Sequence, residues 1–175
     1  MFWTLQVESD LKEILSVQDQ NGISGGEAIV DFYNPLELYC EQSLQGADIA
    51  WFENLNTQMN GKLCELIRPF LDSVYAGDWN YRADEYEFFK HRNPDQADIG
   101  EEKFRQTITD IRNKFTDIRL VLYGIEQMIH ALRKGQFEAT YWYESVASIR
   151  EFEALHYTLL LHSKRGAQKI RIKID

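Results

Sequence analysis

Apolar residues recur at steps of three and four positions along much of the chain, which is the spacing of one buried helix face. Asp98 and Glu101 fit a capping box at the start of the clearest stretch, and Gly135 fits the position after its end. The pattern predicts one long central helix over residues 101–134. Its apolar positions are Phe104, Ile108, Ile111, Phe115, Ile118, Leu122, Ile125, Ile129 and Leu132.

A continuous helix of this length would extend ~50 Å at 1.5 Å per residue. The expected diameter of a compact domain of this size is roughly 40 Å. The helix is therefore expected to protrude, to bend near Gly124, or to pack along a second molecule. The spacing fits a coiled-coil seam and fits an antiparallel helix pair within one domain equally well. We favour the intradomain pair, because the flanking positions lack a regular charge pattern.

A partner helix is predicted upstream, followed by a stop at Gly77. Pro69 interrupts it, so we expect a kink or two shorter helices. Its apolar positions are Leu55, Met59, Leu63, Leu66, Phe70 and Val74. A shorter helix is expected to begin after Ser9 and Asp10.

The C-terminus alternates between isoleucine and basic residues over 169–174, which predicts a half-buried strand. The segment 155–162 is rich in Leu, Tyr and Thr, and 164–167 fits a turn between the two. A C-terminal antiparallel β-hairpin follows, while 137–154 fits a strand or a helix. The expected fold class is α+β: a helix-rich single globular domain over residues 1–175.

Composition supports a folded chain, since 44% of the 175 residues are hydrophobic and 27% are charged. The aromatic share of 13% fits either a thick core or a recognition surface. The N-terminus lacks the basic region of a secretory signal, and no stretch approaches the ~20 apolar residues of a membrane span. We therefore expect a cytoplasmic protein without membrane contact.

The net charge of -9 is unevenly distributed. Residues 1–60 contain ten acidic residues and a single basic one, Lys12. Such a field repels phosphate backbones, so nucleic-acid binding through the N-terminal third is disfavoured. A basic protein is the partner that this charge favours.

No histidine, cysteine or carboxylate pair has the spacing of a metal or catalytic site, so no metal and no cofactor are expected. His156 and His162 lie ~20 Å apart on the predicted strand and cannot chelate one ion together. Cys40 and Cys64 are too distant in sequence for a chelating or redox pair, and we expect buried free thiols. Carboxylate pairs such as Glu37 with Glu41, or Glu85 with Glu87, more commonly form a solvated acidic face than an acid–base pair.

The segment 78–89 interleaves aromatic and acidic side chains. Such surfaces bind basic partners, with the rings as anchors and the acids as steering charges. The candidate binding residues are Trp79, Tyr81, Glu85 and Tyr86. An alternative is that the rings cap the core between two helices.

No motif is specific enough to indicate a family. The preferred hypothesis is a small acidic, non-enzymatic protein-binding factor, such as an inhibitor, an immunity-type protein or an accessory protein, that docks on a basic partner. One alternative is an enzyme with a dispersed site near Glu126 and His130, which could meet one helical turn apart, together with Tyr123. Another is a structural homodimer built on the 101–134 helix.

Overall fold

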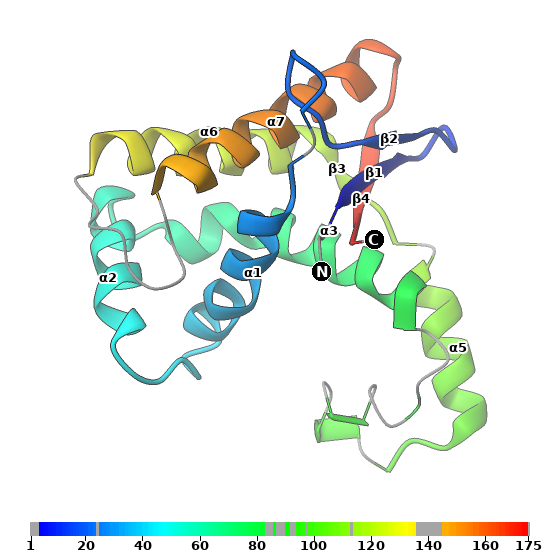
Figure 1. Cartoon of the computed structure of the whole chain (residues 1–175). Coiled ribbons are helices and arrows are strands. Elements are labelled where there is room, and N and C mark those ends of the chain that lie inside the picture. Colours follow the sequence, from blue (N-terminus) through cyan, green and yellow to red (C-terminus); the bar gives the residue numbers. More distant parts are fainter. Residues whose placement is uncertain are drawn as a thin grey trace.

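Helices and one small sheet make up the computed structural model, which describes residues 4–23, 25–82, 86, 90–91, 94–96, 98–112, 114–135 and 145–174 (Figure 1). The elements are β1 (Leu5–Ser9), β2 (Ile14–Ser16), α1 (Glu27–Cys40), α2 (Asp48–Gln58), α3 (Leu63–Arg82), the 3-10 turn η1 (Pro94–Gln96), α5 (Glu101–Arg112), β3 (Thr116–Asp117), α6 (Ile118–Lys134), α7 (Ser145–Lys164) and β4 (Lys169–Ile174). The predicted α+β, helix-rich class is confirmed.

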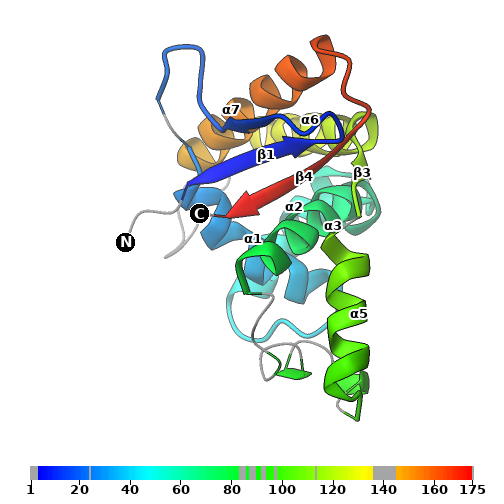
Figure 2. The same ribbon diagram turned by 90° about the vertical axis from the view of Figure 1, so that its right-hand side faces the viewer.

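The sheet has the strand order β2-β1-β4-β3, with antiparallel neighbours throughout. Its central pair joins the first and last strands of the chain, and Val7 lies opposite Ile172 (Figure 2). The alternation of burial along β1 places Leu5 and Val7 in the core and Glu8 on the outer face. There Glu8 contacts Arg171 at 2.8 Å and Lys173 at 3.0 Å. Burial raises the pKa of Glu8, but these two partners outweigh it and the net shift is downward.

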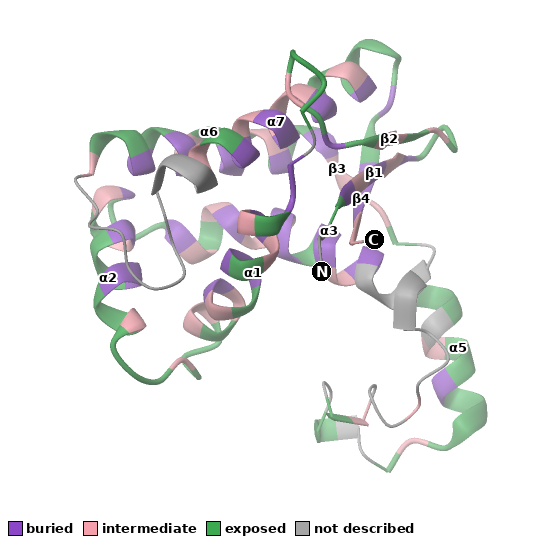
Figure 3. Cartoon of the chain, in the orientation of Figure 1, coloured by how far each residue is buried: buried purple, intermediate pink, exposed green. Residues whose placement is uncertain are grey.

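Aromatic rings join the helices into one core, coloured purple in Figure 3. Phe32 of α1 lies 5.6 Å from Phe52 of α2 and from Phe152 of α7, measured between ring centroids. Phe70 of α3 lies 5.7 Å from the same Phe152 ring. Four helices thus share one aromatic cluster, and edge-to-face pairs of this kind add to the burial of apolar area.

Two glycines allow helices to touch neighbouring backbone directly. A Cβ at Gly77 of α3 would lie 1.6 Å from the carbonyl oxygen of Ile172 in β4. A Cβ at Gly124 of α6 would lie 2.1 Å from the carbonyl oxygen of Leu66 in α3. Helix α3 is therefore placed against the sheet on one side and against α6 on the other, at distances that only glycine allows.

The prediction of one long central helix over 101–134 is wrong. The segment forms α5, the short strand β3 and α6, because Thr116 and Asp117 pair with β4. The side chain of Asp117 then caps α6 by accepting a hydrogen bond from the amide of Arg119 at 2.8 Å. The apolar spacing continues across this break, so periodicity alone could not detect it. A homodimer built on a continuous 101–134 helix loses its structural basis.

The predicted burial of the stripe within this segment is confirmed at its described ends and centre. Phe104, Ile118 and Leu132 are each at most 4% exposed, while Phe115 is half-buried. Phe115 carries the Arg171 guanidinium 4.9 Å from its ring centroid. The described part of the stripe therefore stays buried or half-buried although the backbone changes from helix to strand and back.

The predicted C-terminal hairpin is also wrong, although its second strand exists. Residues 155–162 belong to α7, and β4 pairs with β1 and β3 instead. Leu155, Leu159 and His162 are buried at steps of four and three, which is a helical face. Of the ambiguous segment 137–154, the part from Ser145 onward is helical, and the rest lies outside the described residues.

Upstream, the predicted apolar helix is divided between α2 and α3 at 59–62, and α3 continues through Pro69 and Gly77. The helix expected after Ser9 and Asp10 is instead a turn followed by β2. The division between α2 and α3 falls at a turn in which Asn60 and Gly61 both have a positive φ. The second difference arises because a short apolar run fits either period, and here pairing with β1 selects the strand.

Glu151 of α7 is a buried carboxyl group that fixes the start of α1. Its two oxygens accept hydrogen bonds from the amide of Gly26 at 2.6 Å and the amide of Ile29 at 3.0 Å. These amides lie at a helix N-terminus, where the first N–H groups lack partners within the helix and a negative charge is stabilised. The contact ties α7 to α1 across more than a hundred residues.

His162 predicts a loss of stability in mild acid. It is 1% exposed, and its Nε2 lies 2.8 Å from the carbonyl oxygen of Val7. Burial lowers the pKa of His162 despite the raising effects of this bond and of Glu13, while Arg165 adds to the lowering. The unfolded chain therefore binds the proton more readily. The contribution of neutral His162 to stability is fully present above the pKa of the unfolded chain, about 6.5. It is lost as the pH falls through the lower pKa of the folded protein.

The measurement is the urea midpoint of the wild-type protein and of His162→Gln at pH 7.5, 6.5 and 5.5. The amide of the variant keeps a donor for Val7 but does not titrate, so its midpoint should fall less over this range. Equal pH dependence in the two proteins would show that other groups cause the loss.

Candidate functional site: the acidic face of α1

Helix α1 presents an acidic outer face. Its exposed positions follow one another at steps of four and three from the first residue of the helix to its C-cap, and its helical residues contain no Lys, Arg or His. These positions are Glu27, Asp31, Asn34, Leu38 and Glu41. The opposite face holds buried Ile29, Phe32, Tyr33 and Leu36. Leu38, which is 42% exposed, places an apolar side chain among the acids.

A cavity of about 220 Å³ lies beside this face, where α1 meets α3. Three carboxyl groups, one guanidinium and two phenol rings line it, so its walls are negative and partly aromatic. The lining residues are Tyr33, Glu37, Glu41, Arg68, Leu71, Asp72 and Tyr75. A hollow with these walls has the chemistry to accept a positively charged side chain.

Two carboxyl groups of this region, those of Asp72 and Asp31, have a raised pKa. Partial burial raises the pKa of Asp72 and the charge of Glu37 adds to it, although Arg68 and Lys114 act in the opposite direction. Partial burial and the charge of Glu27 likewise raise the pKa of Asp31. An incoming cation would relieve this repulsion, which is a favourable contribution to binding.

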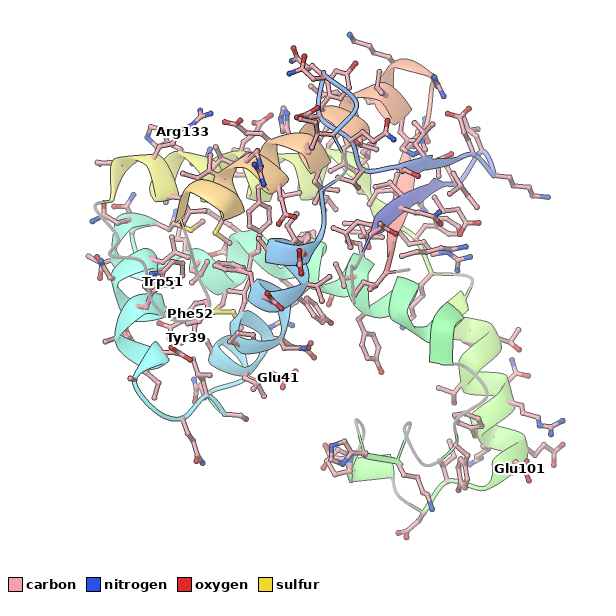
Figure 4. The ribbon with its side chains drawn as sticks, viewed as in Figure 1. Tyr39, Glu41, Trp51, Phe52, Glu101 and Arg133 are labelled. Atoms are coloured by element: carbon pink, nitrogen blue, oxygen red, sulfur yellow. A yellow bond between two sulfur atoms is a disulfide. The ribbon has the colours of Figure 1, made fainter. Side chains whose placement is uncertain are left out.

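A second cavity, of about 440 Å³, opens at the C-terminal end of α1. It is lined by Tyr39, Cys40, Gln42, Leu44, Ile49, Glu53, Asn56, Gly61 and Cys64. Burial and a hydrogen bond to Glu53 raise the pKa of Tyr39. The Tyr39 ring stacks on Phe52 at a centroid distance of 5.5 Å, and Figure 4 shows these two residues near the end of α1.

Cys40 and Cys64 form a disulfide, so the prediction of free thiols is wrong. Their Cα atoms lie 5.4 Å apart although 24 positions separate them in sequence. Disulfide formation requires spatial proximity rather than short sequence spacing, and only the packing of α1 on α3 provides it.

The four binding residues predicted from the sequence are only partly described. Trp79 and Tyr81 belong to α3, but their side chains, and the whole of Glu85, lie outside the described residues. Tyr86 is half-buried: its hydroxyl donates a hydrogen bond to the carbonyl of Ile99, and its ring lies 5.1 Å from that of Phe104. The binding role of this segment stays a prediction.

The residues of the enzyme hypothesis, Tyr123, Glu126 and His130, are all exposed on α6 at steps of three and four, and their catalytic role stays a prediction. Glu126 lies 2.8 Å from Nε2 of His156 in α7. Among the described residues, no group of three His, Cys, Asp or Glu side chains is arranged to hold a metal ion. None of the described helices is long and apolar enough to cross a membrane.

In the sequence, Glu37 and Glu41 stand out only as a carboxylate pair, and the acidic face of α1 is not apparent as a unit. A signal is nonetheless present, because polar positions from Glu27 to Glu41 follow a helical step. The contribution of Asp72 could not be found this way, since it comes from another helix. Comparisons with protein-family models, curated proteins and solved structures found no match.

Proposed function

We propose that this protein is a small acidic binding factor that docks on a basic partner protein through the outer face of α1 and the adjoining hollow. The observation that carries the proposal is the hollow between α1 and α3, where three carboxyl groups surround one arginine. The lining holds three carboxyl groups and one guanidinium, although Lys114 also acts on Asp72. A lysine or arginine of the partner would add positive charge at this acidic lining.

Affinity requires more than charge, because exposed charges mainly accelerate association. Leu38 offers an apolar contact on the same face, and the rings of Tyr33 and Tyr75 line the hollow beside Asp72. The partner surface that fits is therefore amphipathic, with basic side chains flanking an apolar one. The position of Trp79 in α3 lies two turns beyond Asp72, and the binding role of segment 78–89 stays a prediction.

The test is a titration with a fluorescent, basic amphipathic helical peptide in which Lys and Leu alternate at helical spacing. We expect Glu37→Gln with Asp72→Asn to weaken binding about tenfold, since desolvated charge pairs contribute more than a kcal/mol each. Raising the salt concentration should weaken wild-type binding more than that of the variant.

Two controls distinguish binding at the α1–α3 hollow from nonspecific attraction between an acidic protein and a basic peptide. Glu102→Gln with Asp110→Asn removes two exposed carboxyl groups from α5 and changes the net charge by the same amount. A scrambled peptide keeps the charge but not the apolar face. Equal losses in both double variants, or equal affinity for both peptides, would reject a defined docking surface.

A further inference from the structure

The Cys40–Cys64 disulfide joins the two helices that form the acidic hollow. Cys40 is the last residue of α1 and Cys64 is the second residue of α3. Cys40 directly precedes Glu41, and Cys64 lies one turn before Arg68, so the link sits at the edge of the hollow. Figure 4 shows the disulfide close to Phe52, with Glu41 also near the end of α1.

The disulfide lies beside a cavity rather than inside the core. Both cysteines are half-buried, and both line the cavity of about 440 Å³ beside Tyr39 and Glu53. A cavity of this size admits a small thiol compound. Reactivity of a disulfide depends on such access, in contrast to disulfides enclosed in a core.

This end of α1 also contacts α2. Tyr39 stacks on Phe52 of α2 and shares a hydrogen bond with Glu53. The disulfide is a covalent link between the last turn of α1 and the first turn of α3, and it limits the spacing between them. Glu37 and Asp72 depend on that spacing, because they reach the hollow from opposite helices.

We propose that the Cys40–Cys64 disulfide is a thiol-exchange site whose reduction opens the acidic hollow and weakens binding of the basic partner. This regulation rests on the function proposed above. Disulfides persist in oxidising compartments and are reduced by cytosolic thiols, so the binding surface would respond to its surroundings.

The chemistry needs a dithiol reductant. Its thiolate attacks one sulfur of the disulfide, the S–S bond breaks, and a mixed disulfide forms while the other cysteine leaves as a thiolate and takes a proton. The second thiol of the reductant then attacks the mixed disulfide and releases the remaining cysteine. Two electrons and two protons pass to Cys40 and Cys64, and the dithiol becomes a cyclic disulfide.

Breaking the disulfide removes a covalent constraint between α1 and α3 at the edge of the hollow. Glu37 raises the pKa of Asp72, but Arg68 and Lys114 act in the opposite direction, so the loss of the constraint rather than repulsion allows the opening. With the link intact, the helices hold Glu37 and Asp72 near one another. With the link reduced, α1 can move away from α3 at this end, and the paired carboxyl groups no longer converge on one cation.

The experiment measures two properties of the full chain before and after treatment with dithiothreitol. Mass spectrometry after alkylation should count no free thiol before treatment and two after it. Affinity for the basic amphipathic peptide should fall at least fivefold on reduction and return on reoxidation. Amide hydrogen exchange of residues 37–41 should accelerate at least tenfold, while that of residues 121–129 in α6 stays unchanged.

The double variant Cys40→Ser, Cys64→Ser should bind the peptide as weakly as the reduced protein, and dithiothreitol should not change its affinity. Circular dichroism checks that the variant is folded. If it does not fold, the reduced wild-type protein supplies the same comparison. Failure of the oxidised protein to bind the peptide rejects the proposed function, and hydrogen exchange then still decides whether the link closes the hollow. Two outcomes would overturn the redox inference alone. In the first, two free thiols are counted after reduction but peptide affinity and amide hydrogen exchange do not change. In the second, the two thiols do not reoxidise to the disulfide.

Discussion

Replacing Gly77 with alanine is expected to lower the free energy of unfolding by about 3 kcal/mol or more. In an ordinary helix interior the same change stabilises by up to about 1 kcal/mol, because alanine has the higher helix propensity. Here the added Cβ would lie 1.6 Å from the carbonyl oxygen of Ile172, and the second atom within reach is also backbone. Since neither can rotate away, α3 must move off the sheet, and overpacked cores lose stability.

Urea denaturation of the two proteins, followed by circular dichroism, measures the difference. Gly100→Ala is the matched control, because a Cβ at Gly100 meets nothing within 4 Å and that glycine has no positive φ. The control should change stability by about 1 kcal/mol or less. A Gly77→Ala variant as stable as the wild type would show that α3 and β4 are not in the contact described.

Replacing Glu151 with alanine is expected to cost about 3 kcal/mol or more. The side chain is 6% exposed and accepts two hydrogen bonds, from the amides of Gly26 and Ile29. Both amides would be left buried without a partner, and each such group costs about 1–3 kcal/mol. A charged acceptor at a helix N-terminus adds to the loss.

The matched control is Glu153→Ala on the same helix. Glu153 forms a more exposed ion pair with Arg133, and such pairs contribute about 1 kcal/mol or less. Chemical denaturation of both variants provides the comparison, and hydrogen exchange of the first turn of α1 locates the effect. Similar losses in the two variants would mean that Glu151 does not hold the start of α1.

Period-based predictions succeeded where one face of an element meets the core. The alternation over 169–174 predicted β4, and five members of the apolar stripe of 101–134 are buried: Phe104, Ile118, Ile125, Ile129 and Leu132. Phe115 and Leu122 are only half-buried, and the buried Val121 and Met128 lie outside the stripe. The predictions failed at the break between α5 and α6. The two residues of β3 are selected by pairing with β4, which is far away in sequence.

The candidate site was predictable only in part. The acid excess of residues 1–60 suggested a basic partner, and the spacing from Glu27 to Glu41 gives the outer face of α1. The hollow needs Arg68, Asp72 and Tyr75 from α3, and no local pattern indicates which helix packs beside α1.

By itself the sequence determined the α+β class, the strand at 169–174 and the negative charge of the N-terminal third, because these follow from local periodicity and from counting. Only the tertiary structure decided which segments meet. It paired β4 with β1 rather than with residues 155–162, and it placed Cys40 beside Cys64. The physical reason is that contacts between distant segments depend on how whole faces pack together. Side chains that look isolated in sequence, such as Glu151 at the start of α1, acquire their roles from that packing.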